Sequence, residues 1–208
     1  MHPNPSFRKE TDERSIEFAR RRAFGSLAVN ADPAPLISHV PFLLNENASE
    51  IELHLVRSNP IVQMLKNGSI KAVIAATGGD AYISPDWYEV LDQVPTWNYI
   101  AVNIRGELEL LPQEELHDVL QRQSAEMEKR LLPKSLWTSD KMDQQVYERM
   151  QRQIVPAKMT VEEIESTWKL SQNKPDEVRL RAADGVAKNG IGTETNFVSE
   201  QMRNAKSD

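Results

Sequence analysis

The sequence predicts a mainly β protein with flanking helices (α+β), on three observations. The first is strict alternation in the stretch 94–110, VPTWNYIAVNIRGELEL, which indicates a long strand with one buried face. Its apolar face comprises Ile100, Val102, Ile104, Leu108 and Leu110, with Gly106 between them. The second is a hairpin pattern between residues 35 and 56. The third is the helical spacing of apolar residues that follows Pro112.

The N-terminal part predicts a helix followed by three strands. We expect the helix over 12–22, a first strand over 24–29, and a hairpin whose strands cover 35–44 and 51–56. The hairpin register can be derived from the apolar pattern. Pairing Leu44 with Ile51 also pairs Phe42 with Leu53 and Val40 with Leu55, which gives one clean core face. Pro41 has no N–H to donate, so the strand is bulged or lies at an edge there.

A capped helix and two short strands are expected next. Asn59 is a good N-cap and Pro60 a good first helical residue, and Asn67-Gly68 ends that helix. We expect strands over 71–77 and 81–84, separated by a turn at Gly78-Gly79-Asp80. The segment Ser84-Pro85-Asp86 then leaves the sheet as a loop.

The C-terminal half predicts helices around a returning strand. Helical patterns start at Pro112 and cover 142–154, residues 155–159 suit a strand, and 161–170 suit either helix or strand. After Pro175 the pattern is helical to about Lys188, and the last residues are flexible or lie on a partner subunit. We therefore expect a single domain over 1–208, with a helical insertion at 112–153 and a helical or flexible tail at 175–208.

Composition excludes several classes of function. Asp and Glu number 31 against 25 Lys and Arg, and the net charge of −6 argues against direct DNA binding. The absence of cysteine removes disulfides and thiolate chemistry. No apolar run approaches the roughly 20 residues of a membrane span, and the first residues lack the apolar core of a signal peptide. We expect a cytoplasmic protein with no membrane association.

Common catalytic and metal motifs are also missing. The sequence contains no G-x-S-x-G, no P-loop and no G-x-G-x-x-G. His39 and His54 share a face in the predicted hairpin, roughly 7–8 Å apart at the backbone. A metal usually requires three or more ligands, so we predict no metal site. The pair nevertheless keeps a haem-handling alternative open.

Five short motifs, in order, carry a resemblance to a known family. They are SHVPF (38–42), RSNP (57–60), AYISPDWY (81–88), VPTWNY (94–99) and KLSQN (169–173). Together they resemble the PaiB family of FMN-binding split-barrel proteins, which are related to pyridoxamine-phosphate-oxidase-like flavoproteins. The resemblance implies a split β-barrel of antiparallel strands that forms a homodimer. It also implies FMN as the cofactor, bound in clefts where the two subunits meet.

FMN needs cations and donors for its phosphate, apolar walls for its ring, and positive charge near the N1–C2 carbonyl region. Arg57, Ser58 and Asn59 lie between a strand and a helix, which suits a phosphate. Trp97 suits the ring, and Lys169, Ser171 and Gln172 suit a cation with donors. The predicted cofactor-binding residues are therefore Ser38, His39, Arg57, Ser58, Asn59, Trp97, Lys169, Ser171 and Gln172.

The sequence departs from the family pattern at three places. Asn103 stands where the family has His, Ser166-Thr167 where it has Gly-Lys, and Pro156-Ala157 where it has Gly-Phe. The lost lysine and glycine remove two features that the family offers to a flavin.

Three functions follow from the resemblance. The first is a flavin-dependent oxidoreductase of the flavin-reductase type that acts on a small-molecule redox substrate. The second is a regulatory protein that binds FMN without turnover, as the family's label of transcriptional regulator suggests. The third is a haem-handling split barrel. No catalytic residue can be assigned from the sequence.

Overall fold

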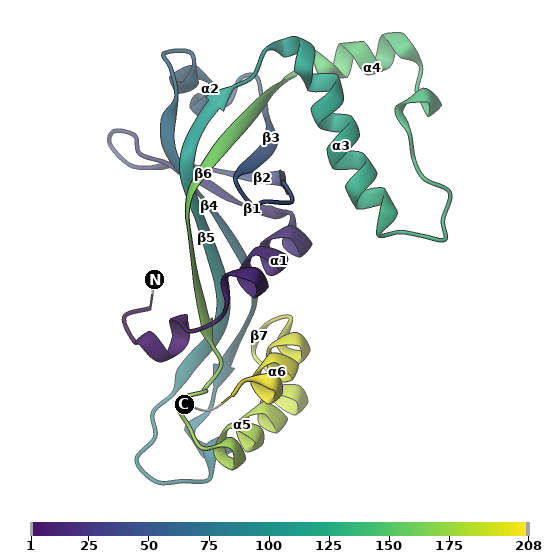
Figure 1. Cartoon of the computed structure of the whole chain (residues 1–208). Coiled ribbons are helices and arrows are strands. Elements are labelled where there is room, and N and C mark those ends of the chain that lie inside the picture. Colours follow the sequence, from purple (N-terminus) through teal and green to yellow (C-terminus); the bar gives the residue numbers. More distant parts are fainter. Residues whose placement is uncertain (1, 207–208) are drawn as a thin grey trace. The chain divides into compact units, whose positions relative to one another are not determined.

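The computed structural model describes residues 2–206, and within them seven strands form one sheet (Figure 1). The strand order is β1-β2-β3-β6-β5-β4-β7, with a further pairing between β1 and β4. The strands are β1 (Phe24–Val29), β2 (Leu36–Leu44), β3 (Glu50–Val56), β4 (Ile70–Ile83), β5 (Thr96–Leu110), β6 (Ile154–Lys169) and β7 (Gly192–Thr193). This is the mainly β architecture with flanking helices that the sequence predicts.

The helices precede, interrupt and follow the strands. The α-helices are α1 (Asp12–Arg22), α2 (Pro60–Leu65), α3 (Leu116–Lys129), α4 (Gln144–Gln151), α5 (Asp176–Asn189) and α6 (Thr195–Asn204). The 3₁₀ turns are η1 (Pro5–Arg8), η2 (Pro85–Tyr88), η3 (Gln113–Glu115) and η4 (Ser139–Lys141).

The chain divides into two compact units. Unit 1 comprises Met1–Phe18, Ala76–Asn103 and Glu165–Asp208, and unit 2 comprises Ala19–Ala75 and Ile104–Ile164. The three longest strands, β4, β5 and β6, contribute residues to both units.

Unit 2 is a closed barrel. Its strands β1 and β4 pair antiparallel from Ser26 opposite Ala75 to Val29 opposite Ala72, and this pairing closes the series β1-β2-β3-β6-β5-β4. β1 also pairs with β2, and β3 with β6, in both cases antiparallel. Large apolar side chains fill its interior, among them Leu27, Ile51, Leu53, Ile74, Ile104, Leu108 and Met159.

Two register predictions are confirmed. Leu44 pairs with Ile51 and Phe42 with Leu53, and the apolar face of the hairpin is buried as predicted. The third predicted pair, Val40 with Leu55, lies beyond the β2–β3 ladder, which ends at Phe42. The β2–β3 pairing runs over Phe42–Leu44 and stops beside Pro41, whose ring nitrogen cannot donate. The alternation of β5 also holds, because every second residue from Asn98 to Leu108 is buried.

Gly106 lies at a close approach of β5 to β6. A Cβ atom at this position would stand 2.0 Å from the carbonyl oxygen of Thr160 and 3.0 Å from the Met159 side chain. A backbone atom cannot yield as a flexible side chain can, so the barrel accepts only glycine here.

Unit 1 is formed by a sheet segment and a helical pair. β7 pairs antiparallel with β4 at Asp80 and Ala81, and α5 and α6 pack against one another (Figure 1). The residues they share as a core are Val178, Ala182, Ala183, Val186, Val198 and Met202. η2 contacts α5, and Arg181 of α5 donates to the Tyr88 carbonyl at 2.8 Å.

The predicted turn at Gly78-Gly79-Asp80 is wrong. β4 continues through these residues as one strand, because Asp80 and Ala81 find ladder partners in β7. Gly79 adopts φ +69°, and a Cβ there would lie 2.8 Å from Val198 of α6. The glycine therefore permits a local backbone conformation and a close helix contact without ending the strand.

Three further predictions need correction. The helix expected over 142–154 ends at Gln151, and Ile154 already belongs to β6. β6 is one strand from Ile154 to Lys169, because its first half pairs with β3 along the whole of that strand. The loop expected at Ser84-Pro85-Asp86 forms the 3₁₀ turn η2, and Pro85 at its first position suits such a turn.

The helix expected after Pro175 is confirmed as α5, and the residues after Gly192 form the additional helix α6. Residues 207 and 208 of the predicted tail lie outside the described part of the chain. The division into one domain with an insertion at 112–153 stays a prediction.

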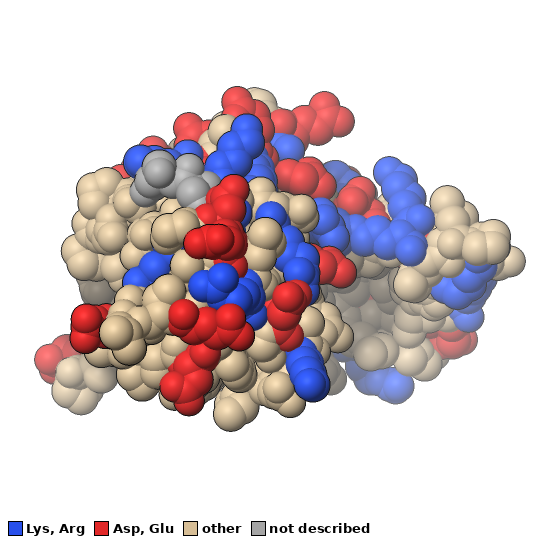
Figure 2. Space-filling model, turned by 90° about the horizontal axis from the view of Figure 1, so that it is seen from below, with Lys and Arg blue, Asp and Glu red and all other residues tan. Residues whose placement is uncertain are grey.

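The charged surface is mixed in sign. On the face drawn in Figure 2, Lys and Arg side chains are interspersed with Asp and Glu and form no continuous basic area. The mixture of signs reflects a composition of 31 acidic and 25 basic side chains. Between residues 2 and 206, no helix combines the length and the apolar character needed to cross a membrane.

Candidate functional site

Unit 1 contains a polar cavity of about 310 Å³, which we call the Lys169 cavity. Three of the five family motifs meet in it, although they are far apart in the sequence. The motif 81–88 contributes Tyr88, the motif 94–99 contributes Val94, Thr96 and Asn98, and the motif 169–173 contributes Lys169, Ser171 and Asn173. The remaining lining residues are His2, Asn4, Phe7, Asp92, Gln93 and Lys174.

A buried hydrogen-bonded cluster forms one wall of the cavity. The Ser171 hydroxyl lies 3.0 Å from the Tyr88 phenol oxygen and accepts from Asn98 Nδ2 at 2.9 Å. Asn98 is 0% exposed, and its Oδ1 has no hydrogen-bond partner among the described residues. Burial raises the pKa of Tyr88, so the phenol stays protonated at neutral pH. The cluster therefore holds one acceptor, Asn98 Oδ1, that lacks a donor.

Two lysines supply positive charge to the cavity. Lys169 Nζ donates to Thr96 Oγ1 at 2.5 Å and lies 5.9 Å from the Phe7 ring centroid. Burial lowers the pKa of Lys169, because a partly desolvated ammonium loses hydration. Lys174 Nζ donates to Gln93 Oε1 and lies 5.4 Å from the Tyr88 ring centroid. Each cation thus lies at the distance of a cation–π contact from an aromatic ring of the protein.

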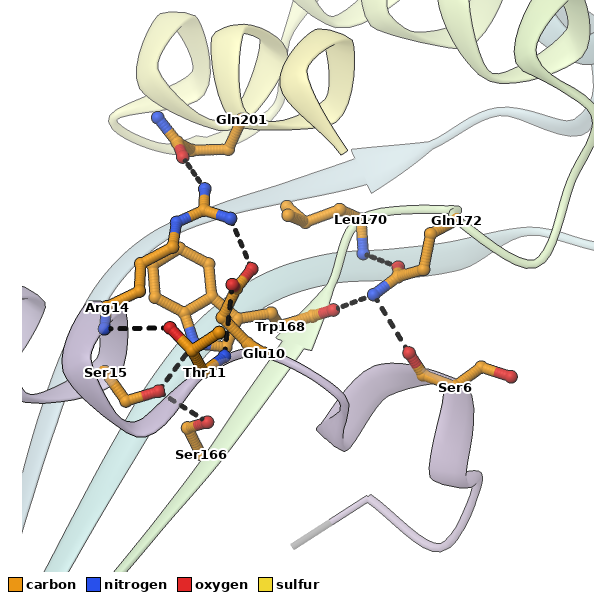
Figure 3. Close-up of polar contacts among 10 residues, drawn as sticks. All are labelled: Ser6, Glu10, Thr11, Arg14, Ser15, Ser166, Trp168, Leu170, Gln172 and Gln201. Atoms are coloured by element: carbon orange, nitrogen blue, oxygen red, sulfur yellow. Dashed lines mark hydrogen bonds and ion pairs between the residues drawn. The ribbon is translucent and has the colours of Figure 1, made fainter. Parts of the chain in front are cut away.

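The turn that carries these residues has a left-handed backbone at Ser171. Its φ of +63° is uncommon for a residue with a side chain. Gln172 holds the turn (Figure 3): its Oε1 accepts from Leu170 N at 2.8 Å, and its Nε2 donates to the carbonyls of Trp168 and Ser6 at 2.5 and 3.2 Å. The predicted contact residue Gln172 therefore positions its neighbours, and it is not among the residues that line the cavity.

A second network anchors Trp168, the residue before Lys169 (Figure 3). The Arg14 guanidinium lies 4.3 Å above the Trp168 ring and donates to Gln201 at 2.5 Å and to Glu10. The indole Nε1 donates to Ser15 Oγ at 3.3 Å. These contacts connect α1, β6 and α6 behind the Lys169 cavity.

A second group of predicted residues gathers in unit 2. Asn59 caps α2 as predicted, since its Oδ1 accepts from Ile61 N at 2.9 Å, while its Nδ2 donates to Ser38 Oγ at 3.0 Å. His39 Nδ1 lies 3.1 Å from Ser26 Oγ, and Ser58 is exposed. The structure thus brings Ser38 and Asn59 together at the end of β3.

Arg57 is engaged by neutral acceptors. Its Nε donates to the Arg152 carbonyl at 2.8 Å, and one terminal nitrogen donates to Gln113 Oε1 at 2.7 Å and to the Ile154 carbonyl at 3.1 Å. These bonds tie the end of β3 to the start of β6. The guanidinium would have to leave these acceptors to reach a phosphate.

Trp97 lies on the face of β5 opposite to Asn98 and is 46% exposed. Its ring meets Tyr82 edge to face at 6.2 Å, and it is not among the residues that line the Lys169 cavity. A role for Trp97 as a wall of the flavin ring stays a prediction.

Each histidine of the predicted pair is hydrogen-bonded through Nδ1. His54 Nδ1 lies 3.0 Å from Gln123 Oε1, and His39 contacts Ser26. Within residues 2–206, no group of three or more His, Asp or Glu side chains could hold a metal ion.

The departures from the family pattern lie outside the lining of the cavity. Ser166 Oγ accepts from Ser15 at 2.8 Å, and Thr167 Oγ1 accepts from His2 N at 3.3 Å. Pro156 and Ala157 pair with His54 and Leu53 of β3. Asn103 is half-buried on β5.

Sequence reasoning missed Asn98, Thr96, Tyr88 and Lys174 as members of the site. The signal for Asn98 was present, because it precedes Ile100 by two residues and so shares the buried face of β5. No comparable signal marks Lys174 or Gln93, which meet through the fold alone.

Comparison with known proteins identifies the family to which this chain belongs. A family model described as "Putative FMN-binding domain" matches residues 1–163. The chain is also 30% identical over 173 residues to the protease synthase and sporulation protein PAI 2 of Bacillus subtilis (strain 168), with 82% of each chain covered. The chain belongs to the PaiB-like family of FMN-binding proteins, and FMN is the cofactor that this family model supports.

Solved structures confirm the split-barrel fold. A FAD and heme binding protein of Mycobacterium smegmatis superposes with a TM-score of 0.58 at 12% identity, covering 90% of this chain and 82% of that chain. A conserved hypothetical protein of Mycobacterium tuberculosis gives 0.56 at 13% identity, covering 81% and 91%. A flavocytochrome of Azotobacter vinelandii gives 0.50 at 13% identity, covering 76% and 68%.

The role of Gln172 predicts a loss of stability on truncation. Gln172→Ala leaves the buried Leu170 N–H without its acceptor. We therefore expect the free energy of unfolding, measured by urea denaturation, to be about 1–3 kcal/mol lower than in the wild type. Gln172→Glu keeps that acceptor and should recover part of the loss. The neighbouring variant Asn173→Ala, which alters an exposed side chain, should change stability by less than about 0.5 kcal/mol. Equal stability of the two alanine variants would show that Gln172 does not hold the turn.

Proposed function

We propose that this protein binds FMN with the residues of the Lys169 cavity and acts as a flavin-dependent oxidoreductase of the flavin-reductase type. The observation that carries the proposal is the meeting of three separate family motifs around one cavity. Membership of an FMN-binding family supports FMN as the ligand, and the meeting of the motifs supports the Lys169 cavity as its binding site.

The residues present fit a flavin. An isoalloxazine ring requires flat apolar contacts, and the cavity provides the rings of Phe7 and Tyr88. The ring also carries carbonyl oxygens and an N–H group, which suit the lysine ammonium groups and the unpartnered Asn98 Oδ1.

The phosphate is assigned separately. We propose Arg57, Ser58 and Asn59, with Ser38 and His39 beside them, as phosphate contacts that the other subunit of a homodimer contributes, because they combine a cation, hydroxyls and an amide. Arg57 reaches a phosphate only by exchanging the carbonyl acceptors that it has in this structure.

The protein's contribution to the chemistry is electrostatic. Bound FMN supplies electron transfer to and from a small-molecule substrate. The Lys169 ammonium stabilises negative charge on a neighbouring group, and its hydrogen bond to Thr96 fixes the direction in which it points. The protonated Tyr88 phenol keeps Ser171 and Asn98 in one hydrogen-bonded arrangement.

Loss of the Lys169 charge should weaken FMN binding. A charge-assisted hydrogen bond contributes about 1.5–3 kcal/mol, and about 1.4 kcal/mol is one decade of affinity. We therefore expect Lys169→Met to raise the Kd of FMN roughly tenfold to a hundredfold in a flavin fluorescence titration. The matched variant Lys188→Met removes an exposed lysine of α5 and should leave the Kd unchanged.

The same titration predicts a pH dependence. The pKa of Lys169 lies below its ordinary value of 10.5 because of burial, and FMN binding favours the charged form. The affinity for FMN should therefore be greatest at pH values below the pKa that Lys169 has in the free protein, and it should fall as the pH rises through that pKa. FMN's own ring proton titrates equally in Lys169→Met, so the difference between the two proteins isolates the lysine. If FMN affinity depends on pH in the same way in the wild type and in Lys169→Met, Lys169 does not contact FMN.

Turnover distinguishes the two candidate functions. The second candidate is regulatory FMN binding without turnover, which the reference to sporulation in the name of the Bacillus relative favours. We expect the FMN-loaded protein to oxidise NADH or NADPH faster than free FMN at the same concentration, as followed at 340 nm. Rates equal to free FMN with both donors, together with tight FMN binding, would favour the second candidate.

We further propose that the protein is a homodimer. Three large apolar side chains on adjacent strands of the unit 2 barrel are more than half exposed: Phe24 (56%), Ile37 (64%) and Val56 (57%). A stable interface buries about 1,200–2,000 Å² and is apolar at its centre, which these side chains suit. Light scattering at micromolar concentration should give a mass of about twice 23.7 kDa. A mass equal to the single chain would contradict the homodimer.

A further inference from the structure

We infer that the Lys169 cavity binds the pyrimidine edge of the flavin ring and not the phosphate of FMN. This inference rests on the proposed function, and it assigns to the cavity one part of the cofactor.

The first step is the chemistry of Asn98. Its side chain is fully buried and lines the cavity, its Nδ2 is used by Ser171, and its Oδ1 is left without a donor among the described residues. A buried acceptor without a donor is energetically costly, and an N–H or O–H group of a bound ligand would satisfy it. A phosphate dianion presents acceptors only and would face Oδ1 with repulsion. The pyrimidine edge of a flavin presents an N–H between two carbonyl oxygens.

The second step is the charge of the lining. Two lysines and one aspartate, Asp92, line the cavity, and the pKa of His2 is lowered by burial and by the neighbouring charges of Lys169 and Arg8. His2 is therefore neutral at pH 7, and the lining carries little excess positive charge for a dianion. Two ammonium donors and one amide acceptor instead complement two carbonyl oxygens and one N–H.

The third step is the apolar part of the lining. Phe7 and Tyr88 are buried, and each ring lies within 6 Å of a lysine ammonium. Aromatic side chains do not strengthen the binding of a phosphate, because a phosphate that leaves water needs polar donors in place of its hydration. The same walls match the flat body of a ring system.

The experiment compares three ligands by fluorescence titration: FMN, riboflavin and riboflavin methylated at N3. Methylation removes the ring N–H, so the wild type should bind the methylated ligand at least tenfold more weakly than riboflavin. Lys169→Met should weaken FMN and riboflavin by the same factor, since both contain the ring. Arg57→Ala, placed at the proposed phosphate contact, should weaken FMN and leave riboflavin unchanged.

A variant of Asn98 adds an independent test. Asn98→Leu replaces the amide by an apolar group of similar size and should abolish the discrimination between riboflavin and its methylated form. Asn189→Leu, at an exposed amide at the end of α5 outside the lining, should retain it. Melting temperatures show whether each variant folds, and the ligand comparison on the wild type requires no variant.

The outcomes separate the inference from the proposed function. If Lys169→Met weakens FMN and leaves riboflavin unchanged, the cavity holds the phosphate and the inference is wrong while FMN binding stands. Equal binding of riboflavin and its N3-methyl derivative to the wild type also overturns the inference. If the wild type binds none of the three ligands, the proposed function itself fails.

Discussion

The two-residue period of β5 is the constraint on which both the barrel and the cavity depend. The face that carries Ile104 and Leu108 into the apolar interior of unit 2 also carries Asn98 in unit 1. Because the strand cannot change face without a break in its pairing, Asn98 is buried by register and not by its own polarity. Its amide must then be satisfied locally, and Ser171 and Tyr88 are the groups that the fold brings to it.

Local signals predicted the parts of the fold in which sequence neighbours decide the structure. The β2–β3 register followed from apolar pairs, and the start of α2 followed from the Asn59 cap and Pro60. The failures lie where distant partners override a local pattern. Two glycines and an aspartate predicted a turn, but pairing with β7 keeps β4 continuous. Likewise, pairing with β3 extends β6 to Ile154, against the helical spacing of its residues.

The candidate site shows the same division between local and distant information. Lys169 and Ser171 were identified because their motif is recognisable as a short segment. Lys174 could not be, since its partner Gln93 lies 81 positions away and carries no pattern of its own. Gln172 was predicted as a ligand contact, and in the structure its side chain forms hydrogen bonds with the backbone of Leu170 and Trp168. Side-chain type alone does not distinguish these two roles.

The part of the Lys169 cavity formed by His2, Asn4 and Phe7 has a kinetic consequence. Among the hydrogen bonds that hold this segment are those from His2 N to Thr167 Oγ1 and from Gln172 Nε2 to the Ser6 carbonyl. Surface segments near a chain end open locally at lower free energy than core strands do. We therefore expect entry and departure of an occupant to follow the opening rate of residues 2–8. Residence time would then depend on a short surface segment, whereas affinity depends on the buried wall opposite it.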